Sequence, residues 1–414
     1  MPKSLPFSIS RSMALQGLLE EASPPAGARA PGRAWTPGEA PPPAGAPASP
    51  RPQQQAGLRL LIVMGKGGTG KTTVAGALAV ALARRGQKVL AVSVDPAHNL
   101  GDVLATHLGP EPQQITGAAP LRPPGGARAG GHVRDARWQP GLWALEMDVR
   151  REMDRYLEQL AGSVRGAYRY LEVLNLGRYL ETLRFSPGVE EQAVLEAIGR
   201  LRSLAERDSF DVLILDTPPT GQAMRLLSLP AVSVQWAEQL AQVRRALLER
   251  RAAIARAVGP EEATLGGEGG VRLQLPTDPR HDEVMGILLD YSARSGALQQ
   301  WMRDPALCGV VMVRNPDRLS GLETGRALQD LAAFGIPVAL GVLNRMGRPL
   351  DAESEAARGG QDLIRLFISG FEARVPGSDP EPLDLPFPVR AVPLRDPEPS
   401  GVEALAEVSR SLVD

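Results

Sequence analysis

The sequence of 414 residues has few of the residues that build metal and redox sites: one cysteine, Cys308, and four histidines. A single cysteine excludes a disulfide or a thiolate cluster within one chain, and it fits a reducing compartment. Cys308 precedes an apolar run at 309–313, where a small buried apolar residue is the expected role. No metal role is expected for the histidines, which lack metal-ligand spacing: His98, His107, His132 and His281.

Several function classes are disfavoured by charge and by the lengths of the apolar runs. The formal net charge is −1 and no basic patch occurs, which argues against nucleic acid as the main partner. No apolar run approaches the roughly 18 to 20 residues that span a bilayer. The N-terminus lacks the apolar core of a signal peptide and carries Glu20 and Glu21 early. We therefore expect a cytoplasmic protein, with peripheral attachment at the inner membrane left open.

Lysine is also scarce, and its placement is informative. Only four of the 46 basic residues are lysine, and two of them, Lys66 and Lys71, lie in one glycine-rich stretch, GKGGTGKTT at 65–73. An ammonium is a compact charge that reaches among phosphate oxygens where a planar guanidinium would clash. The stretch fits G-x-x-x-x-G-K-[ST], the phosphate-cradling loop. It predicts a nucleotide-phosphate site.

The segments around this loop have the order that the motif requires. An apolar run at 58–64 is typical of a buried parallel strand, and 74–83 has a helical pattern. Backbone N–H groups of such a loop converge on an anion at the helix N-terminus. Lys71 is expected to reach the β- and γ-phosphates, and the Thr72 hydroxyl to bind Mg²⁺. The predicted nucleotide-binding residues here are Gly65, Gly67, Gly68, Thr69, Gly70, Lys71, Thr72 and Thr73.

Two further apolar runs, 88–94 and 211–215, each end in an aspartate. Asp95 follows the first, where it is placed to orient water for attack on the γ-phosphate; the alternative is a helix cap with Pro96 at the first helical position. Asp216 follows the second, in the pattern of the acid that supports Mg²⁺ through its water shell. The turn at 217–221 is expected to respond to the γ-phosphate and to pass its state to the next helix.

Three segments together resemble the arsenite-pump-driving ATPase family (ArsA), which includes the guided-entry ATPases that target tail-anchored membrane proteins. They are the loop with Lys66, DPAHNLGD at 95–102, and DTPPTGQAMRLL at 216–227. The similarity spans about residues 57–411, with shorter matches such as 144–148, 313–324 and 343–345. The resemblance implies a deviant phosphate-loop ATPase with a doubly wound, mainly parallel α/β sheet and α-helical insertions. It also implies hydrolysis of MgATP in a nucleotide-sandwiched homodimer.

The resemblance also implies roles for single residues. Lys66 corresponds to the lysine that reaches the partner's nucleotide across the dimer, although a solvated loop lysine is the alternative. Asp95 corresponds to the acid that activates water, and together with Lys66 and Lys71 it forms the expected catalytic set. Asn344 corresponds to an adenine-binding amide, which offers both a donor and an acceptor. Asp317 stands where the family often has a glutamate near the nucleotide.

The sequence departs from the family in two respects. The resemblance implies that the pump-driving members sense metalloids at a site of three cysteines, and that the zinc-bridged targeting members need a Cys-x-x-Cys pair. This chain has Cys308 alone. Metalloid sensing by cysteine is therefore not expected, and a dimer clamped by zinc through such a pair is excluded. The segment 216–227, called the second switch below, has Gln222 where relatives often have histidine. This difference leaves the signalling role of the second switch open.

Composition divides the chain into a tail and an ATPase domain. Residues 1–56 are rich in proline, alanine and glycine and are expected to be disordered, either as a tether or as sequence upstream of the true start codon. Residues 57–414 form the expected ATPase domain. It carries a low-complexity insertion at 117–137 and a helical subdomain at about 150–207 and 231–303.

The helical subdomain carries apolar stripes with two interpretations. Apolar residues at helical spacing occur at 150–184, 190–206, 234–258 and 283–303. The glycine-rich stretch 259–270 is expected to separate the helix at 234–258 from the helix at 283–303. A stripe on one helix consists of Val234, Trp236, Leu240, Val243, Leu247, Ile254 and Val258. We expect these stripes to be buried within the subdomain, because methionines that make grooves adaptable are few there. The alternative is an open groove that holds a client's transmembrane helix, as in the targeting relatives.

Three functions fit the sequence. The first is an ATPase whose hydrolysis drives a membrane partner such as a pump. The second is a nucleotide-gated chaperone or targeting factor that captures hydrophobic helices of membrane-protein clients. The third, a partitioning or cluster-assembly ATPase, is disfavoured by the Asp-Pro-Ala-His switch at 95–98.

Overall fold

The structure is a computed structural model, and it describes residues 15, 57–95, 99–118, 139–167, 182–258, 262–265, 271–274, 277–347, 363, 366–367 and 385–413. The tail predicted at 1–56, apart from Leu15, lies outside these residues. Most of the insertion predicted at 117–137 also lies outside them, and so do residues 96–98 of the segment 95–102, called the first switch below.

The core of the fold is an eight-stranded sheet in the order β10-β9-β8-β1-β5-β2-β4-β3. Its neighbouring strands are parallel except for the β3–β4 pair. The strands are β1 (Arg59–Gly65), β2 (Lys88–Ser93), β3 (Gln113–Ile115), β4 (Gly141–Glu146), β5 (Val212–Asp216), β8 (Cys308–Arg314), β9 (Val338–Met346) and β10 (Val389–Pro393). The predicted doubly wound, mainly parallel sheet is confirmed. Its central strands are buried on both faces, which explains their continuous apolar runs.

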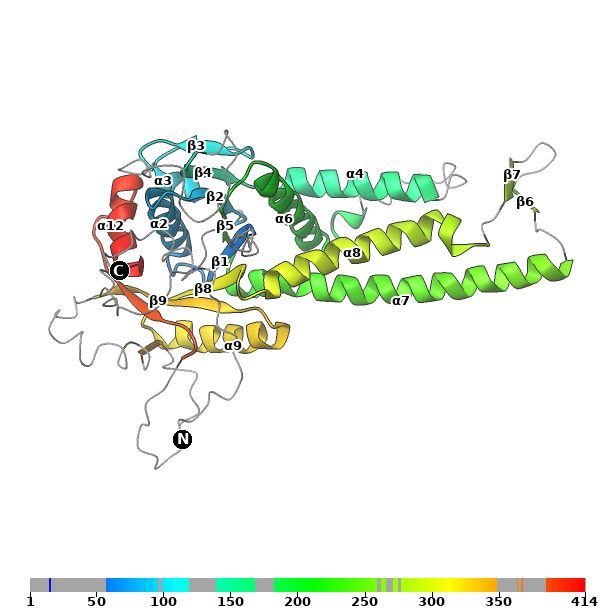
Figure 1. Cartoon of the computed structure of the whole chain (residues 1–414). Coiled ribbons are helices and arrows are strands. Elements are labelled where there is room, and N and C mark those ends of the chain that lie inside the picture. The colour runs from blue at the N-terminus through cyan, green and yellow to red at the C-terminus, as the bar shows by residue number, and fades with distance from the viewer. Residues whose placement is uncertain are drawn as a thin grey trace, which may run out of the picture.

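Helices cover both faces of the sheet, and each face has its own hydrophobic core (Figure 1). One face packs against α2 (Lys71–Arg84), the short α3 (Leu100–Leu104) and α12 (Val402–Val413). The other face packs against α6 (Val189–Arg207), α9 (Arg318–Phe334) and the sheet-proximal ends of two longer helices, α7 and α8. The phosphate loop lies between β1 and α2, at the centre of this arrangement.

The two longer helices, α7 (Thr220–Val258) and α8 (Glu283–Arg303), run side by side away from the sheet (Figure 1). At about 1.5 Å per residue, the 39 residues of α7 are about 58 Å long. Beside them lies α4 (Val149–Ala167). In the chain, α7 and α8 are connected by a hairpin of β6 (Glu262–Leu265) and β7 (Val271–Gln274), followed by the turn η2 (Pro279–His281). The glycine-rich stretch 259–270 separates α7 from α8 as predicted, and it contains the strand β6.

The start of α7 differs from the expected subdomain boundary at residue 231. The helix begins at Thr220 and continues through Pro230, so the second switch turn leads directly into the projection. Proline is tolerated here because the turn around it is packed: Pro230 is buried, as are Met224 and Leu227 nearby.

A buried ion pair joins α7 to α8. Arg244 donates from Nε and Nη2 to the two carboxylate oxygens of Asp282, at 3.0 and 2.7 Å. Asp282 also caps α8 by accepting from the Met285 N–H at 2.8 Å. Arg244 holds the pKa of Asp282 below its usual range, so the carboxylate is charged at neutral pH. This geometry fixes how the two helices lie against each other.

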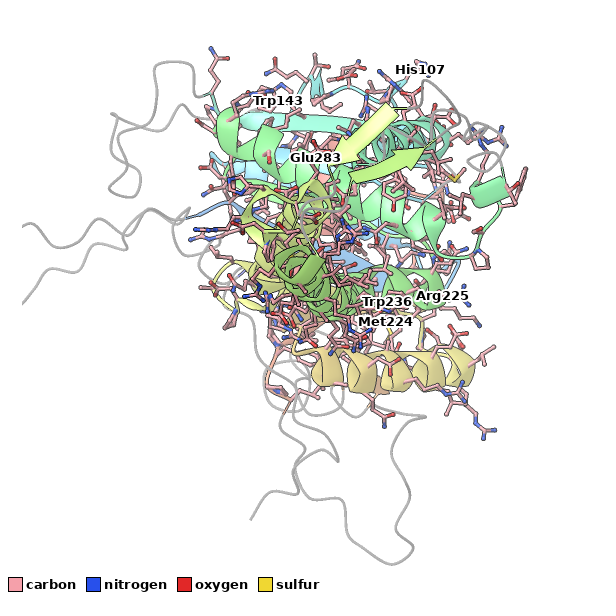
Figure 2. All side chains as sticks on the ribbon, turned by 90° about the vertical axis from the view of Figure 1, so that its right-hand side faces the viewer. His107, Trp143, Met224, Arg225, Trp236 and Glu283 are labelled. Carbon is pink, nitrogen blue, oxygen red and sulfur yellow. The ribbon has the colours of Figure 1, made fainter. Side chains whose placement is uncertain are left out.

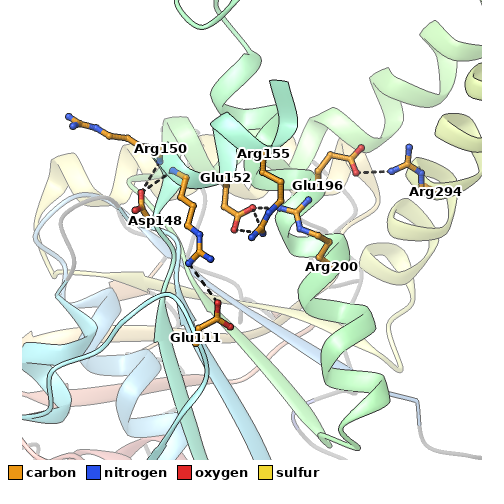
Figure 3. A network of polar contacts seen from close by, with 9 residues as sticks. Glu111, Asp148, Arg150, Glu152, Arg155, Glu196, Arg200 and Arg294 are labelled. Carbon is orange, nitrogen blue, oxygen red and sulfur yellow. Dashed lines mark hydrogen bonds and ion pairs between the residues drawn. The ribbon is translucent and has the colours of Figure 1, made fainter. Parts of the chain in front are cut away.

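Ion pairs also connect α4, α6 and α8 (Figure 3). Glu152 on α4 pairs with Arg155 and with Arg200 of α6. Glu196 of α6 pairs with Arg294 of α8 at 2.9 Å. Such partly exposed pairs contribute little stability each, but they set the relative orientation of the three helices.

Most of the predicted apolar stripe of α7 is exposed, which corrects the expectation that it is buried within the subdomain; Val234 is half-buried, and the side chain of Val258 lies outside the described residues. Trp236 is 63% exposed and Val243 59%. The face of α7 turned toward α8 uses other residues, Ala241 and Leu248. Figure 2, viewed from the far end of the helices, shows Trp236 on the same side of the molecule as Met224 and Arg225. The exposed stripe consists of Val232, Trp236, Leu240, Val243, Leu247 and Ile254.

None of the described helices combines the length and the apolar character that crossing a membrane requires.

Candidate nucleotide-binding site

The phosphate loop folds around the carbonyl of Lys66. That oxygen accepts from the Thr69 hydroxyl at 2.8 Å, from the Thr69 N–H at 3.3 Å and from the Lys71 ammonium at 3.5 Å. The loop also lies tightly against β8, because a Cβ on Gly65 would stand 2.1 Å from the Val313 carbonyl oxygen. The backbone of the loop is therefore held as a narrow turn by its own contacts.

Asn344, at the end of β9, packs directly on the loop. Its side-chain amide donates to the Thr69 carbonyl at 2.8 Å. Gly70 has a positive φ of 85°, and a Cβ there would stand 2.2 Å from the Asn344 amide nitrogen. Glycine is thus required at this position both by the backbone conformation and by the contact.

Replacing Gly70 with alanine is expected to destabilise the protein by about 1–3 kcal/mol and to abolish measurable ATP binding, because Asn344 and the start of α2 must both move. Thermal unfolding and ATP titration measure the two effects. Gly68→Ala is the matched control: Gly68 has a similar φ of 77°, but a Cβ added there would meet nothing within 4 Å. Equal loss of binding in both variants would show that strain alone, not the Asn344 contact, is responsible.

The start of α2 offers its backbone N–H groups to a ligand. Its N-cap is Gly70, which makes no side-chain capping hydrogen bond, and the first turn has no acidic residue. Lys71 begins the helix and is only 6% exposed. Burial lowers the pKa of the Lys71 ammonium, while the carboxylates of Asp216 and Asp95 act in the opposite direction. The result is a buried positive site suited to phosphate.

Asp216, at the end of β5, is the buried acid of the site. It is 1% exposed, and within the described part of the chain neither carboxylate oxygen has a hydrogen-bond partner. Burial raises the pKa of Asp216 to about 7, although the nearby Thr72 hydroxyl and Lys71 favour the charged form. A buried carboxylate without partners costs free energy that a bound cation would recover. Asp216 with the Thr72 hydroxyl is an all-oxygen set, so these residues fit Mg²⁺.

The structure brings Asp95 to this cluster. Asp95 follows β2 and is half-buried, and its negative charge raises the pKa of both Lys71 and Asp216. It has an interaction partner of its own in the folded chain. Residues 96–98 lie outside the described residues, so the alternative of a helix cap at Asp95 remains a prediction. The position at the carboxyl end of a strand beside the loop is the one expected for an acid that orients water.

Lys66 differs from Lys71 in its surroundings. Lys66 is half-buried in the loop, between the exposed Gly67 and the buried Gly65. The Lys66 ammonium is not held in an ion pair by the described residues.

The second switch turn is tied to the loop strand. The Thr217 hydroxyl donates to the Val63 carbonyl at 2.8 Å, and Pro219 lies 3.8 Å from the position of a Cβ on Gly67. Since α7 begins at Thr220, a displacement of the turn moves the first residues of the projecting helix. Gln222 is exposed near this start.

A pocket of about 280 Å³ opens beside the loop. It lies between the start of α2, the end of β9 and the segment after β10, and its lining includes Gly70, Thr73, Asn344 and Arg345. The volume is near the lower end of the range of about 300–1,000 Å³ for ligand pockets. Its position next to Asn344 is suitable for the base of a nucleotide whose phosphates occupy the loop.

Asp317 is placed differently from the other predicted residues. Its carboxylate caps α9 by accepting from the Ser320 N–H at 2.8 Å, and it is absent from the lining of the pocket. Arg314, which the sequence did not single out, is fully buried and donates to the Asp317 and Asn315 carbonyls. A buried arginine that binds backbone carbonyls stabilises the β8–α9 turn. Its signal in the sequence is an arginine at the end of an apolar run.

A phosphate loop between a central parallel strand and a helix, with a buried aspartate on the neighbouring strand, defines a P-loop nucleoside triphosphatase. Within this class the chain belongs to the anion-transporting ATPase family (ArsA), whose family model matches residues 58–122 and 130–358. It is therefore an ArsA-type ATPase, as the sequence predicted.

Curated relatives support the same assignment. The chain is 28% identical over 363 residues to the ATPase GET3 of Paracoccidioides lutzii, covering 87% of this chain and 91% of the relative. It is 29% identical over 365 residues to the ATPase GET3 of Podospora anserina, with the same two coverages of 87% and 91%. The similarity therefore includes the helical projection as well as the sheet.

Proposed function

We propose that this protein binds and hydrolyses MgATP as a nucleotide-sandwiched homodimer, and that the nucleotide state gates the capture of hydrophobic helices of membrane-protein clients. The observation that carries the second part is the exposed stripe on α7, the helix that begins at the second switch. An exposed apolar surface of this length marks a binding site. The resemblance to ATPases named GET3 supports a targeting role, and the sequence-based preference for a pump-driving role becomes the second candidate.

The residues of the site have distinct tasks in this proposal. The N–H groups at the start of α2 and the Lys71 ammonium bind the phosphates, and Asn344 binds the base. Thr72 and Asp216 would hold Mg²⁺, and the cation would supply positive charge that neutralises the charge developing on the phosphates. Asp95 orients the attacking water, and Lys66 of the partner subunit contacts the γ-phosphate. This arrangement works by positioning and charge placement.

The second switch connects hydrolysis to the stripe. The Thr217–Val63 hydrogen bond fixes the turn relative to β1, and the turn continues into α7. A turn that shifts when the γ-phosphate leaves would rotate or displace α7 and so alter how the two stripes of a dimer face each other. We propose a cytoplasmic protein that meets its clients before they enter a membrane.

Changing Leu240 and Leu247 together to glutamine is expected to reduce client capture at least about tenfold, because a client helix would lose two apolar contacts. The ATPase rate is expected to remain within about twofold, since both side chains are exposed and distant from the loop. Capture is measured as co-purification of a co-expressed test protein with one C-terminal apolar helix of about 20 residues. Glu238→Gln with Glu249→Gln, exposed on the opposite side of α7, is the control. Unchanged capture by the leucine variant would reject the stripe as the client surface.

The family description as anion-transporting ATPases favours the second candidate, an ATPase that drives a membrane pump. The two candidates differ in one measurable respect. A pump-driving enzyme should hydrolyse ATP faster when its membrane subunit is added in detergent. A targeting factor should instead retain apolar helices in its ATP state.

A further inference from the structure

Four residues stand in register across the sheet at the carboxyl ends of its strands. Val63 of β1 pairs with Asp216 of β5, Asp216 with Ser93 of β2, and Ser93 with Glu146 of β4. Side chains alternate between the two faces of a strand, so residues paired across parallel strands share one face. This face is the one covered by α2, because the preceding residues on it, Ile214, Ala91 and Ala144, belong to the core beneath that helix.

Ser93 has no assigned role in the site, yet its hydroxyl is buried and unsatisfied. The residue is 1% exposed, and its Oγ has no hydrogen-bond partner among the described residues. The carboxylate directly opposite, Asp216, forms no hydrogen bond of normal geometry among the described residues, although the Thr72 hydroxyl lies near enough to lower its pKa. A buried hydroxyl without a partner is rare in native proteins and calls for an explanation.

The backbone around Ser93 is fixed on both sides. Its carbonyl accepts from the Met147 N–H at 2.9 Å, and the next residue, Val94, donates to the Asp216 carbonyl at 2.9 Å. Ser93 and Asp216 are paired on adjacent strands, which lie about 4.8 Å apart, and a hydroxyl can donate to a carboxylate.

We propose that Ser93 is a positioning residue of the metal site. With the cation bound, its hydroxyl would donate to the Asp216 carboxylate and so fix the orientation of the carboxylate that would support Mg²⁺. The inference rests on the proposed function, in which Asp216 supports Mg²⁺. It adds a residue that acts on the metal only through Asp216, as outer partners of metal ligands do.

One of the four residues in register, Glu146, also contacts the first switch. On the far side of Ser93, Glu146 accepts from the Gly101 N–H at 2.8 Å and thereby holds α3, the helix that follows Asp95 in the chain. Ser93 itself precedes Asp95 by two residues. Ser93 thus stands between Asp216 on β5 and Glu146 on β4, the residue that holds the helix following Asp95.

The test is Ser93→Ala. The unfolding midpoint and the apparent Mg²⁺ affinity of this variant distinguish a positioning role of Ser93 from a structural role. Without nucleotide, the unfolding midpoint should stay the same or rise, because the substitution removes an unsatisfied buried hydroxyl. The apparent Mg²⁺ affinity, from titration of Mg²⁺ into protein with a fluorescent ATP analogue, should fall about 10- to 100-fold. Binding of the analogue in EDTA should not change.

Two further variants and the wild type complete the experiment. Ser93→Thr keeps the hydroxyl and should retain the Mg²⁺ affinity within about threefold; if the extra methyl prevents folding, Ser93→Cys, a weaker donor, should give an intermediate affinity. A lower unfolding midpoint of Ser93→Ala with unchanged Mg²⁺ affinity would overturn the inference and make Ser93 structural. If the wild type itself binds ATP without any dependence on Mg²⁺, the proposed function fails and the inference fails with it.

Discussion

The Asp95→Asn variant is expected to bind ATP with an affinity within about threefold of the wild type while its turnover number falls about 10²- to 10⁴-fold. Asparagine keeps the size of the side chain but cannot accept a proton from water. Binding should be retained because the proposed phosphate contacts come from Lys71 and the start of α2. Equilibrium ATP titration and steady-state phosphate release measure the two quantities.

A matched control for this variant lies nearby in the chain. Asp102 is an exposed acid on α3, and Asp102→Asn makes the same chemical change away from the Lys71–Asp216 cluster. It should hydrolyse ATP at the wild-type rate. If Asp95→Asn loses ATP binding as much as turnover, Asp95 has the structural role of a helix cap and not the role of orienting water.

The Lys66→Ala variant is expected to lose hydrolysis by about 10³-fold or more, the effect typical of a cation supplied in trans to a phosphoryl-transfer site. ATP-dependent dimerisation, measured by analytical ultracentrifugation, should weaken in parallel, because the same ammonium bridges the two subunits. ATP binding by the monomer should persist, since Lys66 makes no ion pair within the described part of its own chain. Lys66→Arg should restore only part of the activity, because a planar guanidinium does not replace a compact ammonium.

Mixing two inactive variants tests directly whether Lys66 acts on the partner. A heterodimer of Lys66→Ala and Asp95→Asn subunits contains one site with an intact Asp95 and, from the other subunit, an intact Lys66. At equal mixing about a quarter of the wild-type activity should return if subunits exchange freely in a two-fold symmetric dimer. If Lys66 serves its own site, no mixed dimer has a complete site and activity stays absent. Normal activity in a protein that remains monomeric would remove the trans role altogether.

The sequence was most informative where the chemistry depends on local order along the chain. The phosphate loop must follow a buried strand and open a helix, so the spacing of its glycines and lysine predicted both the fold and Lys71. Acids at the ends of apolar runs predicted Asp95 and Asp216 in the same way, since the carboxyl ends of parallel strands meet at one edge of a sheet. The family followed from these motifs together.

Other features could not be predicted because they depend on which surfaces meet. A helical stripe has the same spacing whether it is buried or exposed, and only the packing of Ala241 and Leu248 on α8 shows that Trp236 faces outward. Strand register likewise has no signature in a single sequence: Ser93, an ordinary residue in an apolar run, gains its importance from standing opposite Asp216. The sequence by itself determined the nucleotide chemistry, because that chemistry is written in contiguous residues. Only the tertiary structure decided which residue stands opposite Asp216 and which face of α7 is exposed. Both depend on contacts between residues that are far apart in the chain.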